Sequence, residues 1–284
     1  MAATPGNDKR AKQRRDNGAP PHAGLVKKMD LQLNGKVAML TGASRGLGRA
    51  MAQALAAEGV KLSICARGAE ALEEAAGQLR SSGGRVFARA VDVCDAAAME
   101  SWLKATVDEL GGVDILVNNA GGARPGSLAE VSEEAWQQTF ELNFFSAVRL
   151  SRLCAGEMEK RGGGAIINIS SIYGREAGGP LTYNASKAAM ISFTKMLARE
   201  FAPKGIRVNS VAPGSILYPG GTWERAFQAN PAFEKDFISH DFPAGRLGRP
   251  DEVAYAVLML ASPRASWITG VCIPVDGAQG RSII

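Results

Sequence analysis

Histidine is nearly absent from this 284-residue chain, which contains only His22 and His240. So few histidines leave little room for a histidine-based catalytic triad or a histidine-rich metal site. The four cysteines form no CxxC pair and lie far apart, at Cys65, Cys94, Cys154 and Cys272. We therefore expect neither a disulfide framework nor a bound metal, and this cysteine usage fits a reducing cytoplasm.

Long hydrophobic runs are also missing, since none reaches the roughly 18–20 residues of a membrane span. The net positive charge lies almost entirely in the N-terminal segment, because residues 1–30 carry +4 of the net charge of +5. Those residues are rich in Pro, Gly, Lys and Arg without apolar periodicity, so we expect a disordered basic tail. The nearly neutral body, residues 31–284, predicts neither a nucleic-acid nor a membrane partner.

A strand, a glycine turn and a helix open the body of the chain. The apolar run 36–40 predicts a buried strand, the Ala-rich stretch 49–58 predicts a helix, and TGASRGLG lies between them. Its glycines permit a tight turn, close approach of a pyrophosphate, and packing of the helix on the strand. A helix start also offers N–H groups to phosphate. The predicted cofactor contacts here are Gly42, Ser44, Arg45, Gly46, Leu47 and Gly48.

The end of the second predicted strand, residues 60–66, indicates which cofactor is bound. A carboxylate that would accept the ribose 2′-hydroxyl of NAD(H) is absent there, and Arg67 follows instead. A guanidinium binds the 2′-phosphate of NADP(H), and Arg45 could add a second cation. We therefore predict a preference for NADP(H), with NAD(H) still possible. The alternative is that Arg67 is an ordinary surface residue.

Strand and helix patterns keep alternating, which predicts an α/β fold with a doubly wound parallel sheet covered on both faces. Ligands of such sheets bind outside the carboxyl ends of the strands. Further cofactor contacts are therefore expected from strand-end residues, namely Asp92, Val93, Asn118, Ala120 and Gly121.

A tyrosine and a lysine share one helical face in the stretch YNASK, residues 183–187. An ammonium beside a phenol favours the phenolate, so Lys187 is expected to lower the pKa of Tyr183. The phenol could then donate or accept a proton near neutral pH. The alternative, a half-buried tyrosine beside a solvated lysine, is less favoured because a nucleotide site and the strand-end hydroxyls of Ser170 and Ser171 precede it.

The segment 215–242 differs in character, with six aromatic residues and four Pro or Gly interruptions. A long aromatic segment after a strand's carboxyl end suggests a substrate lid, with contacts from Tyr218, Trp223 and Phe227. The alternative is a pair of amphipathic helices packed permanently on the domain.

Together these motifs make the chain resemble the short-chain dehydrogenase/reductase family from about Leu33 to the C-terminus. Within the family it looks most like bacterial 3-oxoacyl-thioester reductases and related sugar and polyol dehydrogenases. The resemblance rests on TGASRGLG at 41–48, Asp92-Val93, NNAG at 118–121, Asn143, Ser170-Ser171, YNASK at 183–187 and Pro213-Gly214.

The resemblance implies a Rossmann-type sheet of about seven strands in a single domain. The implied parts are a cofactor half at 36–121, a catalytic half at 122–214, the lid at 215–242, and a C-terminal helix and strand at 250–276. It also implies a cytoplasmic homo-oligomer, a tetramer or dimer that associates through the helices 143–160 and 181–201.

The resemblance further implies a role for each catalytic residue. Tyr183 would be the general acid, and Lys187 would lower its pKa and hold the nicotinamide ribose. Ser171, rather than Ser170, would hydrogen-bond the substrate carbonyl. Asn143 would position a water molecule that leads from Lys187 to solvent. Further nicotinamide contacts would come from Pro213, Gly214 and Ile216.

These residues fit an NADPH-dependent reductase of a ketone with an apolar part, such as a 3-oxoacyl thioester. The alternatives are an NAD(P)-dependent dehydrogenase of a sugar or other secondary alcohol and, in another class, a catalytically vestigial NADPH-binding module. Two features depart from the family pattern. Where family members often carry a threonine, a few residues after the Pro-Gly pair, this chain has Tyr218 nearby. An acidic carrier protein would require clustered cations near the site mouth, but the stretch Glu157–Arg161 (EMEKR) has mixed charge.

Replacing Tyr183 by Phe removes only the phenolic hydroxyl, so we predict an intact fold and the loss of about two to four decades of turnover. Steady-state kinetics, with circular dichroism as the folding control, would measure both. Near-normal turnover in Tyr183→Phe would refute the assignment.

Overall fold

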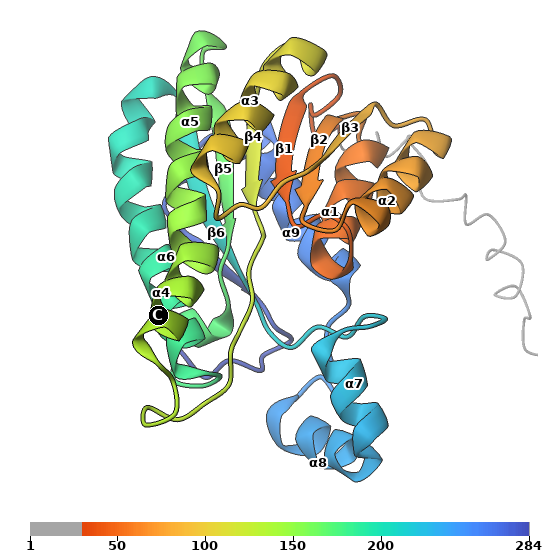
Figure 1. Ribbon diagram of the computed structural model, residues 1–284, viewed down its shortest axis with the longest axis vertical. Coiled ribbons are helices and arrows are strands. Elements are labelled where there is room, and N and C mark those ends of the chain that lie inside the picture. Colours follow the sequence, from red (N-terminus) through yellow and green to blue (C-terminus); the bar gives the residue numbers. More distant parts are fainter. Residues whose placement is uncertain (1–29, 284) are drawn as a thin grey trace, which may run out of the picture. The chain divides into compact units, whose positions relative to one another are not determined.

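A seven-stranded parallel sheet organises the computed structural model, which describes residues 30–283 (Figure 1). The predicted tail at residues 1–30 therefore falls outside the described residues except for Asp30. The strands are β1 Val37–Thr41, β2 Lys61–Ala66, β3 Val86–Ala90, β4 Ile115–Asn118, β5 Gly164–Ile169, β6 Ile206–Pro213 and β7 Cys272–Val275. The predicted α/β fold with a Rossmann-type sheet of about seven strands is thus confirmed.

The order of the strands sets the place of the site. It is β3-β2-β1-β4-β5-β6-β7, so after β3 the chain crosses back to place β4 beside β1 and then adds strands in the opposite direction. All of these pairs are parallel, which places every carboxyl end at one edge of the sheet. A crevice outside such a reversal point is the usual ligand site of an α/β sheet.

Helices cover both faces of the sheet. The helices α1, α2 and α9 pack on one face, and α3, α5 and α6 pack on the other. Their bounds are α1 Gly46–Ala57, α2 Ala69–Ser81, α3 Ala96–Leu110, α5 Ser146–Lys160, α6 Leu181–Phe201 and α9 Pro250–Ala261. A short α4, Glu133–Phe140, runs through a π-helical turn, Glu141–Phe145, into α5.

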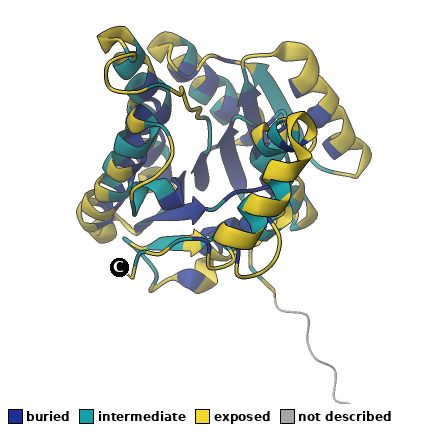
Figure 2. Cartoon of the chain, turned by 90° about the horizontal axis from the view of Figure 1, so that it is seen from below, coloured by how far each residue is buried: buried dark blue, intermediate teal, exposed yellow. Residues whose placement is uncertain are grey.

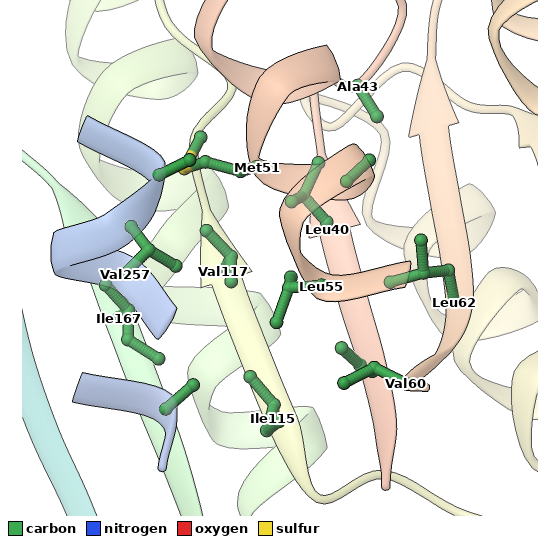
Figure 3. Packing of buried hydrophobic residues seen from close by; sticks show 14 of the residues in the cluster. Leu40, Ala43, Met51, Leu55, Val60, Leu62, Ile115, Val117, Ile167 and Val257 are labelled. Carbon is green, nitrogen blue, oxygen red and sulfur yellow. The ribbon is translucent and has the colours of Figure 1, made fainter. Parts of the chain in front are cut away.

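The sheet is buried from both sides because its side chains alternate. On β1, Ala38 and Leu40 join the cluster beneath α1 and α9, whereas Met39 joins the cluster beneath α3, α5 and α6. Figure 3 shows the first cluster, which brings together Leu40 of β1, Met51 of α1, Val117 of β4 and Val257 of α9. Figure 2 shows the buried strands enclosed by helices whose outer faces are exposed. Strands buried in this way read as continuous apolar runs.

The aromatic segment folds as two further helices, α7 Thr222–Ala229 and α8 Pro231–Asp241. They stand apart from the two helical layers in Figure 1 and have a small core of their own. That core consists of Phe227, Phe242 and Leu247, with Trp223, Phe237 and Ile238 packed around it. Asn230 begins α8 by accepting a hydrogen bond from the Phe233 N–H at 3.2 Å. The segment is therefore helical, and its role as a substrate lid stays a prediction.

A buried carboxylate fastens the amino-terminal edge of the sheet. Asp114 accepts hydrogen bonds from the Val37 N–H at 2.8 Å and from Arg161 Nε and Nη2 at 2.9 and 3.0 Å. Burial raises the pKa of Asp114, but the Arg161 and Val37 hydrogen bonds and the Lys36 charge outweigh it and lower the pKa. The contacts join β1, β4 and the end of α5.

We predict that Asp114→Asn lowers the free energy of unfolding by about 2–3 kcal/mol near neutral pH, since a buried charge-assisted network is broken. The pKa of Asp114 is lower in the folded chain, so the loss is full above pH 3.8 and shrinks as the pH falls below it. Urea unfolding would measure it. Asp108→Asn, which breaks the exposed Lys104–Asp108 pair, is the control and should cost less than about 1 kcal/mol. Equal losses in the two variants would contradict this account.

Candidate active site

A cleft of about 1030 Å³ opens at the carboxyl ends of the strands. It contains most of the residues that the sequence assigns to a site. Those that line it are Gly42, Ser44, Arg45, Leu47, Gly48, Arg67, Val93, Ala120, Gly121, Ser171, Tyr183, Lys187, Pro213, Gly214, Ile216, Tyr218 and Trp223. No group of three or more His, Cys, Asp or Glu side chains that could hold a metal ion occurs within residues 30–283.

The glycine turn has the form that a dinucleotide phosphate requires. A Cβ atom at Gly48 would overlap the Gly42 carbonyl oxygen, and Gly42 itself has a φ of 69°. Asn119 fixes the turn by donating to the carbonyls of Thr41 at 2.8 Å and Gly42 at 3.1 Å. At the start of α1 no side chain caps the helix. The N–H groups and the positive dipole end of α1 thus remain available to an anion, so the turn fits a nucleotide.

Gly46, which was expected to contact the cofactor, instead lies against a tyrosine ring. The ring of Tyr218 lies against it, since a Cβ atom at Gly46 would be 2.8 Å from Tyr218 Cε2. The glycine itself does not line the cleft. Its φ of 54° and this contact explain why a glycine stands here, and Tyr218 links the start of the aromatic segment to the glycine turn.

Two arginines flank the cofactor end of the cleft. Arg45 lies within the glycine turn and Arg67 follows β2, and both side chains are exposed. Neither forms an ion pair or a hydrogen bond within the described part of the chain. Their guanidinium groups are therefore available to a phosphate bound beside them.

The catalytic helix α6 packs tightly on the end of β5. Ser170 Oγ donates to the Lys187 carbonyl at 3.0 Å, and a Cβ atom at Gly174 would lie 2.6 Å from the same carbonyl. Deeper in the helix, Asn168 Nδ2 donates to Thr194 Oγ1 at 2.9 Å. These contacts fix the position of Tyr183 and Lys187 over the end of β5.

Lys187 is buried, and its ammonium donates to the Ile169 carbonyl at 2.7 Å. Burial lowers the pKa of Lys187 from 10.5 to about 8. Its Nζ lies 5.5 Å from the centroid of the Tyr183 ring, so both side chains that the YNASK spacing brings to one face do meet.

The expected fall in the pKa of Tyr183 is wrong for the chain without ligand. Burial raises this pKa, the nearby Ser171 hydroxyl opposes the rise, and Tyr173 and Tyr218 add to it. The phenolate loses hydration in the cleft, and the ammonium that was expected to compensate is directed to a backbone carbonyl. Tyr183 is therefore held as the neutral phenol at neutral pH.

The two serines differ in what their hydroxyls contact. Ser171 lines the cleft beside Tyr183 and accepts a hydrogen bond from the Tyr173 N–H at 3.2 Å. Ser170 also borders the cleft, but its hydroxyl is occupied by the Lys187 carbonyl. The contact of Ser171 with a substrate carbonyl stays a prediction.

Asp92 and Asn118 do not line the cleft, although both are at strand ends. Asp92 accepts a hydrogen bond from the Cys94 N–H at 2.9 Å and shapes the turn after β3. Asn118 is buried between β4 and β5, where it donates to Asn168 Oδ1 at 2.8 Å and Ser151 Oγ at 3.2 Å. Successive strand residues point to opposite sides, and it is Asn119 that contacts the glycine turn.

Asn143 and Phe227 are also outside the cleft lining. Asn143 lies buried in the π-helical turn, where its Oδ1 accepts the Gly122 N–H at 2.9 Å and its Nδ2 donates to the Gly122 carbonyl at 2.8 Å. A Cβ atom at Gly121 would lie 2.6 Å from Asn143 Oδ1 and 3.5 Å from Lys187 Nζ, so the two side chains converge there. Phe227 belongs to the core of α7 and α8.

Several lining residues escaped the sequence reasoning, among them Asn119, Ser215 and Tyr173. Asn119 follows Asn118, and only the side-chain alternation of β4 could have selected it. Ser215 and Tyr173 also line the cleft. Tyr173 packs against Gly178 and Gly179, where a Cβ atom would overlap its ring or lie 2.6 Å from it. Two glycines a few residues after a tyrosine do not indicate, in the sequence alone, that the tyrosine lines a cleft.

The mixed-charge stretch Glu157–Arg161 lies away from the cleft mouth of its own chain. It ends α5 and immediately precedes β5, so it lies at the amino-terminal edge of the sheet, where Arg161 binds Asp114. Its other cation is paired as well, because Lys160 donates to Glu157 at 2.6 Å. This stretch therefore provides no cations at the entrance.

Comparison with known proteins gives relatives that cover nearly all of the body. The chain matches the family model described as enoyl-(acyl carrier protein) reductase over residues 42–278. It is 41% identical over 250 residues to 3-oxoacyl-(acyl-carrier-protein) reductase of Vibrio cholerae, a match that covers 88% of this chain and 99% of that protein.

Two similar solved structures contain nicotinamide cofactors. L-sorbose reductase from Gluconobacter frateurii, complexed with NADPH and L-sorbose, is 36% identical, has a TM-score of 0.85, and matches over 90% of this chain and 100% of its own. 7α-Hydroxysteroid dehydrogenase, complexed with NADH and 7-oxo glycochenodeoxycholic acid, is 35% identical with a TM-score of 0.81, over 87% and 95%.

The lowered pKa of Lys187 has a measurable consequence for stability. Below pH 8 the folded chain must hold Lys187 as a buried ammonium. Between pH 8 and 10.5 the Lys187 side chain is neutral in the folded chain but still charged in the unfolded chain. Relative to Lys187→Met, the free energy of unfolding of the wild type should therefore rise by about 3 kcal/mol across this range.

Denaturant unfolding of the ligand-free chain at several pH values would measure this rise. Lys195→Met, at an exposed position of the same helix, is the matched control for loss of a lysine. A constant difference between wild type and Lys187→Met from pH 8 to 10.5 would contradict the buried-ammonium account.

Proposed function

Because the chain belongs to the short-chain dehydrogenase/reductase family, and is thus a nicotinamide-dependent oxidoreductase, we propose that it is an NADPH-dependent carbonyl reductase. One observation carries the proposal. Ser171, Tyr183 and Lys187 converge in a cleft that also holds a phosphate-binding turn and two unpaired arginines.

The lining of the cleft supports a substrate with an apolar body. Away from the cofactor end it is built from small, aliphatic and aromatic side chains, namely Ala123, Pro125, Leu142, Ile172, Tyr173, Pro180 and Trp223. The charged lining residues are Arg45 and Arg67, at the cofactor end, and Lys187 beneath Tyr183. A mostly apolar pocket with a few polar groups suits an uncharged ketone better than a polyhydroxylated one.

The proposed reaction uses three side chains. A nicotinamide bound in the cleft would supply the hydride to the carbonyl carbon. Tyr183, kept protonated by its raised pKa, donates a proton to the carbonyl oxygen as negative charge develops there. Ser171 Oγ donates a second hydrogen bond to the same oxygen. Lys187 supplies a cation beneath the phenol and can hold the ribose hydroxyls.

The positioning role of Asn143 follows from its contacts. Its amide holds the Gly122 backbone next to Lys187, so it shapes the region from which a water would reach the ammonium. That the water is present stays a prediction.

The second candidate is reduction or oxidation of a sugar or another secondary alcohol, which the similarity to L-sorbose reductase favours. NADPH and NADH consumption should be compared on 3-oxoacyl thioesters, apolar cyclic ketones and ketohexoses. Turnover of apolar ketones above sugars supports the first candidate, and turnover of sugars alone supports the second. Tight NADPH binding without any turnover would support a vestigial binding module.

Two further predictions stay open. A homo-oligomer is expected through the outer faces of α5 and α6, and α6 exposes Met196 at 63%. A cytoplasmic location is expected from cysteine usage. Among the helices of the described residues, none is both long and apolar enough to span a bilayer.

We predict that Arg67→Ala lowers kcat/KM for NADPH about tenfold or more, because a charge-assisted contact to the 2′-phosphate is lost. The value for NADH, which lacks that phosphate, should change less than about threefold. Steady-state kinetics with both cofactors would measure the ratio. Arg225→Ala, at an exposed position of α7, is the control. Equal losses with NADPH and NADH would overturn the role given to Arg67.

A further inference from the structure

The C-terminal segment Asp276–Ser282 touches two walls of the cleft. On one side Gln279, which is buried, contacts the loop that follows β6. On the other side the backbone of residues 281 and 282 contacts Glu176, in the loop between Ser171 and α6. Neither contact is part of the proposed chemistry, yet both loops line the cleft.

Gln279 holds Ser215 through both ends of its amide, one end on the backbone and the other on the side chain. Its Oε1 accepts the Ser215 N–H at 2.7 Å, and its Nε2 donates to Ser215 Oγ at 3.0 Å. Gly214 completes the contact, because a Cβ atom there would lie 2.6 Å from Gln279 Oε1. Pro213, Gly214 and Ser215 line the cleft, so a buried amide sets the position of one wall.

The segment is itself shaped to present this amide. Asp276 Oδ1 accepts the Ala278 N–H at 3.1 Å, and its Oδ2 accepts the Gly280 N–H at 2.9 Å. Ala278 itself has a φ of 66°, in the left-handed region that a residue with a Cβ atom rarely adopts. A local conformation of this cost persists only where surrounding contacts maintain it.

The second anchor reaches the catalytic loop. Glu176 Oε2 accepts the N–H groups of Arg281 at 2.5 Å and Ser282 at 2.7 Å. The Glu176 carbonyl in turn accepts Asn184 Nδ2 at 2.9 Å, and Asn184 follows Tyr183 directly in α6. The same short segment therefore fixes the loop after β6 and the loop that leads into the catalytic helix.

We propose that Gln279 is a positioning residue for the cofactor, which acts by holding the Gly214–Ser215 backbone against the nicotinamide end of the cleft. The inference rests on the proposed function, since it requires the cofactor to bind in this cleft. Without the amide, the Ser215 N–H is left buried and unpaired, and the loop can leave its position to reach water.

The test is direct titration with NADPH in the absence of substrate, followed by energy transfer from tryptophan to the bound cofactor. Gln279→Leu, close in size and without either hydrogen bond, should raise the dissociation constant and KM for NADPH by roughly tenfold or more. Its kcat at saturating NADPH should stay within about threefold. Gln53→Leu, at an exposed position of α1, is the matched control.

A double-mutant cycle separates positioning from a general loss of stability. Ser215→Ala keeps the N–H bond to Gln279 and should weaken NADPH binding only slightly, and Ser215→Ala combined with Gln279→Leu should be no weaker than Gln279→Leu alone. If Gln279→Leu does not fold, Gln279→Asn, whose amide is one methylene shorter, should show an intermediate increase.

Unchanged NADPH affinity in a folded Gln279 variant, or additive effects in the cycle, would overturn the positioning role while the proposed function stands. An equal fall in kcat and affinity would also overturn it. If the wild type binds neither NADPH nor NADH, the proposed function fails, and this inference fails with it.

Discussion

The buried ammonium of Lys187 is the constraint on which the arrangement of the site depends. It forms a hydrogen bond with the Ile169 carbonyl at the end of β5, and a cation in such a place costs free energy unless it is compensated. The Lys187 ammonium is buried because α6 lies close to the sheet, and this close packing also brings Tyr183 beside Ser171. Gly174 and Ser170 make that approach possible, since one removes a side chain and the other bonds the helix backbone.

This constraint also explains why Tyr183 has a raised pKa. In the cleft the Lys187 ammonium donates a hydrogen bond to the Ile169 carbonyl. The Tyr183 phenol is buried by protein and lies near the phenols of Tyr173 and Tyr218. A neutral phenol is the form that a reductase needs, because the carbonyl oxygen must receive a proton. The electrostatics of the cleft and the proposed direction of the reaction are therefore consistent.

Much of this architecture could be predicted from the sequence. The predicted strands 36–40 and 60–66 match β1 and β2 to within one residue at each end, and YNASK located Tyr183 and Lys187, because periodicity and spacing are local properties. Tertiary packing decided the rest. Asn118 and Asn119 differ only in the side of β4 to which they point, and Phe227 joins a core that forms only when α7 meets α8.

The contacts that sequence reasoning could not provide are those between distant segments. Tyr218 covers Gly46 from 172 positions away in the chain, and Gln279 reaches Ser215 from 64 positions away. The pKa of Tyr183 belongs to the same class, since it depends on burial and on the direction of one ammonium. Residue types and spacing thus identified the chemistry, and packing determined how the groups are held.

The central claim is that this cleft transfers a hydride to a ketone with Tyr183 as the proton donor. The most direct measurement uses NADPH that carries deuterium at both C4 positions of the nicotinamide, with an apolar cyclic ketone and mass spectrometry of the product. The account predicts an alcohol with one deuterium on the carbinol carbon, formed by the wild type and nearly lost in Tyr183→Phe. An alcohol without deuterium, or equal formation of the labelled alcohol by Tyr183→Phe, would contradict it.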